Sequence, residues 1–539
     1  MISICRNALI LHCHLPWLRH AESLHSQEED WWLDVLTDSL LPLLEMLHRL
    51  RDEKVPFKLN LVISPTVLAM MRDPLLQKRA EAHLERNLHL ALTEIERRTD
   101  PEKRPLLQWY ADHYHRLHHY YQQRWQGDLV AALADLRDSG QLEIPASAAT
   151  HAILPLFLKS PTVLHSQIKI GCDYYQECFG QAPELFWLPD CAYSPALDPY
   201  LQANGIRHIL LDEHALSYSK QIPDAGIYHP TQSPTGMQIS YRDVRSSREL
   251  LKLEAGLLHD TRYRQAYKMS GEETPVNGLQ IHLDAKQHNR GGALKIQRMD
   301  SEQAYDPALG KKAAQQHAQQ FLKARSQQAT QLKAQGIQTP CILSIYEAEL
   351  FGHWRFEGIP FLEETLRLFA QQNQLELSSV SQLSPPPSAS ITPVNTVHPI
   401  PCSWGEGDYF ENWLSQENAW IYPHLLRRAE QLQRTLSALQ QNIDGLPDQL
   451  ADHRSRCVSQ MTRELLLAQS SDWAAYMRQA DTRPYATQRF EKHLENFDLL
   501  ASLYSSNEQA NTRQLLTIQK QNPIFPQLDW QAFTTTSNF

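Results

Sequence analysis

The stretch at residues 7–17, NALILHCHLPW, decides the fold class. A short apolar run at residues 8–11 leads directly into His12 and His14. Apolar runs of this length, followed by helical patterns, are typical of buried strands. Arg6 interrupts the apolar run upstream, and no small-residue cleavage site follows, so we predict a first strand and not a signal peptide.

Similar strand-sized runs recur along the chain. Several end in polar or aromatic residues, and longer helical patterns separate them. This alternation predicts a mainly parallel sheet, open or closed into a barrel, with functional side chains at the carboxyl ends of the strands. The further runs are FKLNLVISPT (57–66), LEIPASAAT (142–150), ELFWLPD (184–190), IRHILLDEH (206–214) and CILSIYEAELFG (341–352).

The 539 residues exceed one compact core, so two or three domains are expected. Residues 73–140 show helical periodicity without a strand signal and are predicted to be a helical insertion. The proline- and serine-rich residues 384–402 are predicted to link a main domain, residues 1–383, to a C-terminal domain, residues 403–539. Helices are expected there at about 418–443, 454–479 and 486–504.

Composition excludes several classes of protein. The net charge of −10, without a basic stripe, argues against a nucleic-acid partner. No run approaches the roughly 18 apolar residues that span a bilayer. The eight cysteines are scattered without a C-x-x-C pair, which predicts free thiols and a cytoplasmic location.

A histidine-rich segment, WYADHYHRLHHYYQQRW at residues 109–125, has two interpretations. It resembles a source of metal ligands, yet no acidic partner recurs within it at ligand spacing. We therefore predict a solvated helix face with aromatic packing, and no metal site.

Two further features at strand ends are candidates for chemistry. His12 and His14 alternate, so both project from one face of a strand. They would bind a metal, hydrogen-bond a hydroxylated ligand, or serve as satisfied core histidines. Asp190 follows Pro189 at or beyond a strand end, with Trp187 and Tyr193 as aromatic walls. A helix-capping aspartate is the alternative there.

The segment LSIYEAELFGHWRFEG, residues 343–358, places Glu347 and Glu349 among aromatic residues. Burial and a like charge both raise a carboxyl pKa, as a general acid requires. An exposed edge with alternating acids is the other interpretation. Two acids from separate strand ends, with histidines and tryptophans nearby, suit glycoside cleavage, in which one carboxylate attacks and the other protonates the leaving oxygen.

Motifs along nearly the whole chain show a family resemblance. They include HCHLPWLRH (12–20), GQLEIPASAATHAILP (140–155), FWLPDCAYSPALDPYL (186–201), YRDVRSS (241–247), YEAELFGHWRFEG (346–358), CSWGEGDYFENWL (402–414) and RELLLAQSSDWAAYM (463–477). The chain resembles glycoside hydrolase family 57, and within it the α-1,4-glucan branching enzymes.

The resemblance implies a distorted, incomplete (β/α)7 barrel with a helical insertion, and a C-terminal helical domain that closes the cleft. It implies a retaining transglycosylase of carbohydrate metabolism, which cuts an α-1,4 linkage of an α-glucan and forms an α-1,6 linkage, as in glycogen biosynthesis. It implies no metal and no organic cofactor. By matched position, Asp190 would be the nucleophile and Glu347 the general acid/base. The implied cleft residues are His12, His14, His151, His214, Arg264, His353, Trp354, Trp404, Trp413 and Asp472.

Some positions depart from the family pattern. Asp190 stands where the family has Glu, and Glu347 stands where it has Asp, so the two carboxylates have exchanged lengths. Leu251 replaces a tryptophan, and Tyr218 and Tyr228 are candidates for a mobile-loop tyrosine. Three hypotheses follow: a branching transglycosylase with a shifted site, a hydrolase of the same family, and a glucan-binding homologue without catalysis.

Overall fold

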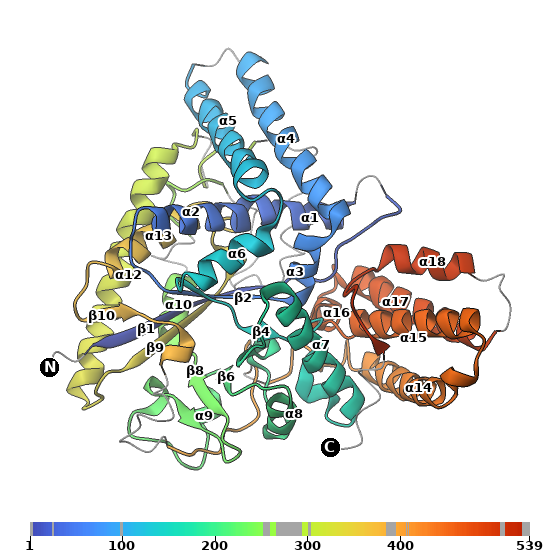
Figure 1. Cartoon of the computed structure of the whole chain (residues 1–539). Helices are drawn as coiled ribbons and strands as arrows, with labels where there is room; N and C mark the ends of the chain where they lie inside the picture. The colour runs from blue at the N-terminus through green and yellow to red at the C-terminus, as the bar shows by residue number, and fades with distance from the viewer. Residues whose placement is uncertain are drawn as a thin grey trace.

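The structure is a computed structural model, shown in Figure 1. It describes residues 4–23, 26–97, 101–251, 259–265, 294–299, 303–383, 395–405, 407, 409–506 and 512–530, and the side chain of Leu251 lies outside this description. Part of the predicted linker, residues 384–394, also lies outside it.

The first sheet is built around β1 (Cys5–Cys13), the strand predicted from residues 7–17. β9 (Cys341–Glu347) pairs with β1 in parallel along residues 6–12, and places Glu347 beside His12. β2 (Leu59–Ile63) and β10 (Leu375–Leu377) pair with other parts of β1, and β3 (Leu142–Glu143) pairs with β2, all in parallel. The sheet therefore brings the carboxyl ends of β1, β2 and β9 together.

The second sheet has the order β4-β5-β6-β8-β7. Its strands are β4 (Ala146–Ser147), β5 (Leu185–Trp187), β6 (His208–Leu211), β8 (Gln238–Tyr241) and β7 (Thr231–Gln232). Only the pairing of β7 with β8 is antiparallel among the pairs described in this sheet. The predicted α/β class with a parallel sheet is confirmed.

The predicted strand at residues 142–150 is divided between the two sheets. β3 ends at Glu143 and β4 begins at Ala146, with Ile144 and Pro145 between them. Proline lacks the N–H that a ladder needs, so it interrupts pairing and lets the chain change sheets.

Helices surround the two sheets (Figure 1). Between residues 73 and 140 the described chain is helical and contains no strand, as predicted, and α4 and α5 form a long hairpin that projects from the rest. The helices before the C-terminal region are α1 (Gln27–Val35), α2 (Leu41–Asp52), α3 (Pro65–Arg72), α4 (Pro74–Arg97), α5 (Arg104–His119), α6 (Leu129–Asp138), α7 (Pro161–Phe179), α8 (Asp198–Ala203), α9 (His214–Ser217), α10 (Val244–Leu251), α12 (Pro307–Ala334) and α13 (Gly358–Phe369).

The C-terminal region is helical, as predicted. It contains α14 (Ile421–Asn442), α15 (Asp448–Ala468), α16 (Ser471–Arg478), α17 (Arg483–Ser505) and α18 (Thr512–Gln521). The expectation of one helix over residues 454–479 is wrong, because Ser470 is extended (φ −53°, ψ 132°) and separates α15 from α16. The short side chain of Ser470 hydrogen-bonds the carboxylate of Asp472, a local bond that competes with helix continuation.

The close packing of α7 against β4 depends on one glycine. A Cβ at Gly171, in α7, would lie 2.0 Å from the carbonyl oxygen of Ser147, so only glycine lets α7 approach this strand. All eight cysteines are free thiols. Among the helices that the structure describes, none has both the length and the apolar character needed to cross a bilayer.

Candidate active site

Two buried histidines connect the carboxyl groups of Asp190 and Glu347. The Nδ1 atom of His12 lies 3.2 Å from Oε2 of Glu347, and its Nε2 atom lies 3.1 Å from Nε2 of His151. The Nδ1 atom of His151 lies 3.8 Å from Oδ2 of Asp190. The histidine pair, His12 and His151, therefore joins the two acids predicted to be catalytic.

The protonation of the histidine pair follows from its surroundings. Burial alone would lower the pKa of His12, but the charges of Glu347 and Asp190 reverse this effect and raise it. Burial, with the neighbouring imidazoles, holds the pKa of His151 well below its ordinary value. One of the two facing nitrogens must donate to the other, and the raised pKa of His12 beside the lowered pKa of His151 favours His12 as the donor.

The C-terminal region completes this arrangement through α16. His14 Nε2 lies 2.8 Å from Oδ2 of Asp472, and the ring of His14 stacks on that of His151 at 3.8 Å between centroids. The Oγ atom of Ser471 lies 2.9 Å from Nδ1 of His151, within hydrogen-bond distance. Burial would raise the pKa of Asp472, yet His14 and the Ser470 hydroxyl lower it, so the group is a carboxylate.

The backbone at Asp190 adopts a rare conformation. Its φ of 52° and ψ of 34° place a non-glycine residue in the left-handed region, at a cost of about 1–3 kcal/mol. Pro189 precedes it, and the amide of Trp404 donates to the Asp190 carbonyl at 2.5 Å. Strain of this kind persists where the surroundings enforce it, which is typical of functional sites.

Tryptophans form an aromatic wall beside the carboxyl groups. Trp187 stacks on His12 with centroids 4.9 Å apart, and Trp404 packs edge-on against Trp187 at 6.1 Å. Trp187 is fully buried, whereas Trp404 is half-buried. These contacts place both tryptophans around His12, and the roles of Trp187 as an aromatic wall and of Trp404 in the cleft stay predictions.

His214 is connected to the wall through a buried ion pair. The guanidinium of Arg242 lies over the Trp404 ring at 4.6 Å from its centroid and donates to Asp212 at 2.8 Å. His214 Nδ1 lies 3.2 Å from the other oxygen of Asp212. Arg242 and Asp212 were not singled out from the sequence, although Arg242 lies within the quoted motif YRDVRSS.

The two acids are more exposed than the histidines beside them. The Glu347 side chain is 33% exposed and that of Asp190 is 21% exposed, whereas His12 and His151 are 3% and 2% exposed. A substrate would therefore meet the carboxyl groups first. The expectation that Glu347 is enclosed by aromatic residues in a dry setting is wrong.

Glu349 occupies the buried aromatic setting instead. β9 ends at Glu347, and residues 348–350 form a single 3-10 turn, so Glu347 and Glu349 do not lie on one strand face. Burial, then the charge of Glu347, raises the pKa of Glu349 to about 8, while the indole N–H groups of Trp31 and Trp354 partly offset the shift. The predicted residue Trp354 thus lies beside Glu349.

Glu349→Gln is expected to stabilise the protein progressively as pH rises. In the native protein the pKa of Glu349 is higher in the folded than in the unfolded state. The free energy of unfolding therefore falls as pH rises from 4.5 to 8, by up to about 1.4 kcal/mol per pH unit. Glutamine does not titrate, so the gap between the variant and the native protein should be small at pH 5 and large at pH 8. Denaturant unfolding measures it, with the exposed Glu376→Gln as control, and a pH-independent gap would contradict the prediction.

Other predicted residues lie in a second buried group, the Asp38 cluster, formed by Asp38, His353, Arg264 and Tyr110. His353 Nδ1 lies 3.8 Å from Asp38, and Arg264 donates to the Tyr110 hydroxyl at 3.3 Å. Although burial acts in the opposite direction, His353 and Arg264 hold the pKa of Asp38 well below its usual range. The contacts described for this cluster do not include the histidine pair.

Trp413 is buried in the apolar core, and its carbonyl accepts a hydrogen bond from the Tyr422 hydroxyl at 2.6 Å. The contacts described for Trp413 do not place its ring against Asp190 or Glu347. Its predicted role in the cleft therefore stays a prediction.

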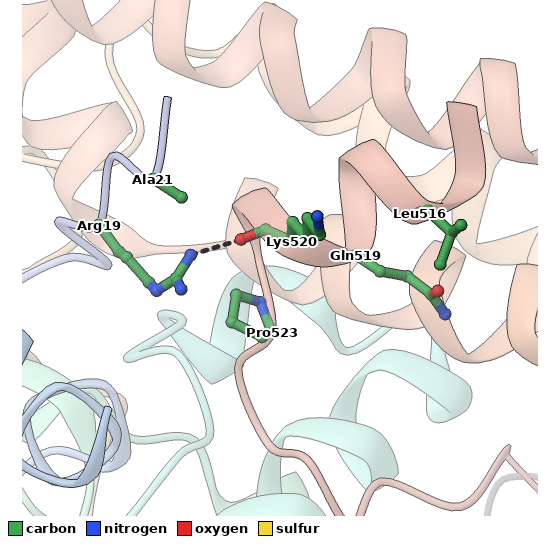
Figure 2. Close-up of a pocket in the computed structure, with 6 residues that line it drawn as sticks. All are labelled: Arg19, Ala21, Leu516, Gln519, Lys520 and Pro523. Atoms are coloured by element: carbon green, nitrogen blue, oxygen red, sulfur yellow. Dashed lines mark hydrogen bonds between the residues drawn. The ribbon is translucent and has the colours of Figure 1, made fainter. Parts of the chain in front are cut away.

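A separate hollow of about 440 Å³ lies between the loop after β1 and α18 (Figure 2). Arg19 points across it to the carbonyl of Lys520 and also pairs with Asp73. The lining residues, Arg19, Ala21, Leu516, Gln519, Lys520 and Pro523, include no carboxylate or histidine, so this hollow offers no groups for glycoside cleavage.

Comparisons with known proteins cover most of the chain. Residues 8–385 match the model described as glycosyl hydrolase family 57, and residues 430–533 match that described as 1,4-alpha-glucan branching enzyme, C-terminal. The chain is 24% identical over 523 residues to the 1,4-alpha-glucan branching enzyme TK1436 of Thermococcus kodakarensis, which covers 92% of this chain and 73% of that protein.

Solved structures share the fold. The alpha-amylase AmyC of Thermotoga maritima superposes with a TM-score of 0.84 at 29% identity, covering 98% of this chain and 99% of AmyC. The crystal structure of TK1436, in complex with glucose and additives, also gives 0.84, at 21% identity, covering 99% and 97% of the two chains. These relatives carry different activity names, one an amylase and one a branching enzyme.

Proposed function

Because the chain belongs to glycosyl hydrolase family 57, we propose that it is a retaining transglycosylase of α-glucans, a 1,4-α-glucan branching enzyme with exchanged catalytic carboxylates. The observation that carries the proposal is the histidine pair, which lies within hydrogen-bond distance of Glu347 at one end and 3.8 Å from Oδ2 of Asp190 at the other. In this proposal the two sheets form the incomplete seven-stranded barrel expected from the resemblance.

The first step cleaves the α-1,4 linkage. Asp190, as a carboxylate, attacks the anomeric carbon, and Glu347 gives its proton to the departing glycosidic oxygen. Once Glu347 has become a carboxylate, a proton on Nδ1 of His12, 3.2 Å from Oε2, stabilises the negative charge there. The glucan is then an ester of Asp190, and the shortened chain departs with a free 4-hydroxyl.

The second step transfers the glucan. Glu347, now a carboxylate, takes the proton from the 6-hydroxyl of an acceptor chain, whose oxygen attacks the anomeric carbon and releases Asp190. If water takes the place of the acceptor, the same chemistry is hydrolysis. Acceptor binding and water exclusion thus decide between the two activities.

Tyr218 is our candidate for the loop tyrosine that excludes water. It is 71% exposed and follows α9, whereas the Tyr228 hydroxyl is held near Asp243 at 3.4 Å. An exposed aromatic side chain can cover a bound sugar without breaking existing contacts. Leu251 stands where the family has a tryptophan, and its side chain lies outside the described part of the structure.

Incubation with amylose tests the function. We expect new α-1,6 linkages to form with little growth of reducing ends, because transfer consumes each cut chain. Linkage analysis and reducing-end assays are scored separately on the same samples. Reducing ends alone would favour the hydrolase, and binding of amylose with neither product would leave a glucan-binding homologue.

A further inference from the structure

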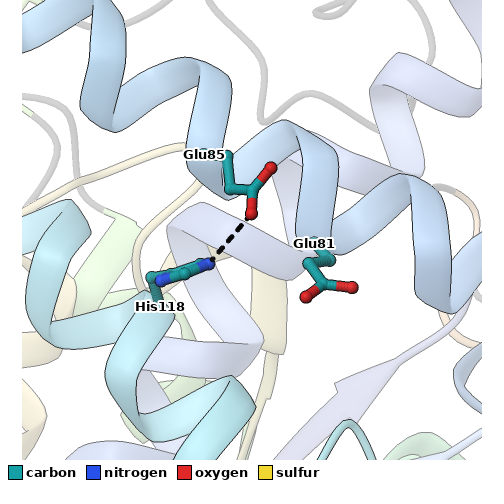
Figure 3. A group of neighbouring side chains, drawn as sticks. All are labelled: Glu81, Glu85 and His118. Carbon is teal, nitrogen blue, oxygen red and sulfur yellow. Dashed lines mark ion pairs between the residues drawn. The ribbon is translucent and has the colours of Figure 1, made fainter.

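The α4–α5 hairpin gathers three side chains with the chemistry of a metal site. Glu81 and Glu85 lie one turn apart on α4, and His118 lies in the last turn of α5 (Figure 3). One ligand atom from each lies within 4.8 Å of the others. The carboxylates come from a different helix than the histidine, so spacing within residues 109–125 could not reveal them.

The imidazole is oriented toward the carboxylates. His118 Nε2 lies 3.7 Å from Oε1 of Glu85, beyond hydrogen-bond distance, and Figure 3 shows the ring directed at that carboxylate. This nitrogen is buried and has no hydrogen-bond partner in the described part of the chain. A buried nitrogen without a partner is destabilising unless a further group satisfies it.

The surroundings of the two carboxylates also favour a cation. Within the described ranges, no lysine or arginine forms an ion pair with Glu81 or Glu85, and Gln122 donates to Glu81 as a neutral amide. Like charges four residues apart on a helix repel each other. A divalent cation would offset this repulsion and at the same time satisfy the His118 nitrogen.

We propose that Glu81, Glu85 and His118 bind one Zn²⁺ ion, which joins α4 to α5 at the base of the hairpin. One imidazole with two carboxylates suits Zn²⁺ and related transition ions, whereas Mg²⁺ and Ca²⁺ prefer oxygen ligands alone. Three protein ligands leave a position for water. The site is independent of the proposed glucan chemistry and stabilises the hairpin.

Equilibrium dialysis of the full-length, chelator-treated protein against Zn²⁺ at pH 7.5 tests the proposal, with bound metal counted by mass spectrometry. The native protein should bind one equivalent more than His118→Ala or Glu85→Gln. His115→Ala and Glu96→Gln, exposed on the same helices, are matched controls and should retain that equivalent. At pH 5.5 the affinity for Zn²⁺ should be lower than at pH 7.5, because protons compete with the metal for its ligands.

Equal zinc content in the native protein and all four variants would overturn the proposal. So would Mg²⁺ binding at this site with the affinity of Zn²⁺, since the imidazole would then not be a ligand. Glu85 is 60% exposed, so Glu85→Gln keeps the test valid if His118→Ala disturbs folding. The readout is bound metal, so a negative result in this experiment is distinct from a negative result in the glucan assay.

Discussion

Asp190→Asn should lower the rate of glucan transfer by about 10⁴-fold or more while leaving glucan binding nearly unchanged. The amide keeps the shape of the side chain but cannot form the ester intermediate, and loss of a nucleophile commonly costs this much. Initial rates of α-1,6 linkage formation and binding isotherms on amylose measure the two effects. Asp224→Asn, an exposed carboxylate in the loop after α9, is the matched control and should retain full activity.

The pH dependence of kcat/KM in the native protein tests the role of Asp190 independently. Burial, together with the charges of Glu347 and Asp472, raises the pKa of Asp190 to about 7 against the opposing effect of His12. Since attack requires the carboxylate, kcat/KM should fall about tenfold per unit below pH 7. Retained activity in Asp190→Asn would remove Asp190 from the chemistry and with it this explanation of the profile.

The exchange of carboxylates predicts a non-additive double variant. Asp190→Glu alone and Glu347→Asp alone should each reduce transfer by about 10²-fold, because each moves one carboxyl by roughly 1.5 Å and changes the gap between the two. The double variant moves both in the same direction and preserves the gap. It should therefore recover to within about tenfold of the native rate.

Initial transfer rates of the four proteins form a double-mutant cycle. The histidine pair gives a physical reason for coupling, because one hydrogen-bonded group contacts both acids. Losses that simply multiply in the double variant would indicate independent positions. A single Asp190→Glu faster than the native protein would contradict the compensated geometry outright.

Local sequence determined much of the fold. The apolar run at residues 8–11 formed β1, and alternation put His12 and His14 within reach of one neighbour, His151. Pro189 restricted the backbone before Asp190, which lies beyond a strand end as predicted. These features depend on residues a few positions apart, whose spacing sets dihedral angles and faces directly.

Tertiary structure alone decided which of the two acids, Glu347 or Glu349, is exposed and which partners hold the histidines. The single 3-10 turn after β9 buried Glu349 and left Glu347 accessible, and packing of α16 brought Ser471 to His151 across 320 positions. In the same way, the packing of α4 against α5 brought Glu81 and Glu85 near His118, which the spacing within residues 109–125 could not reveal. Such contacts depend on how separate elements pack, and the periodicity of one element does not encode the side chains of its neighbour.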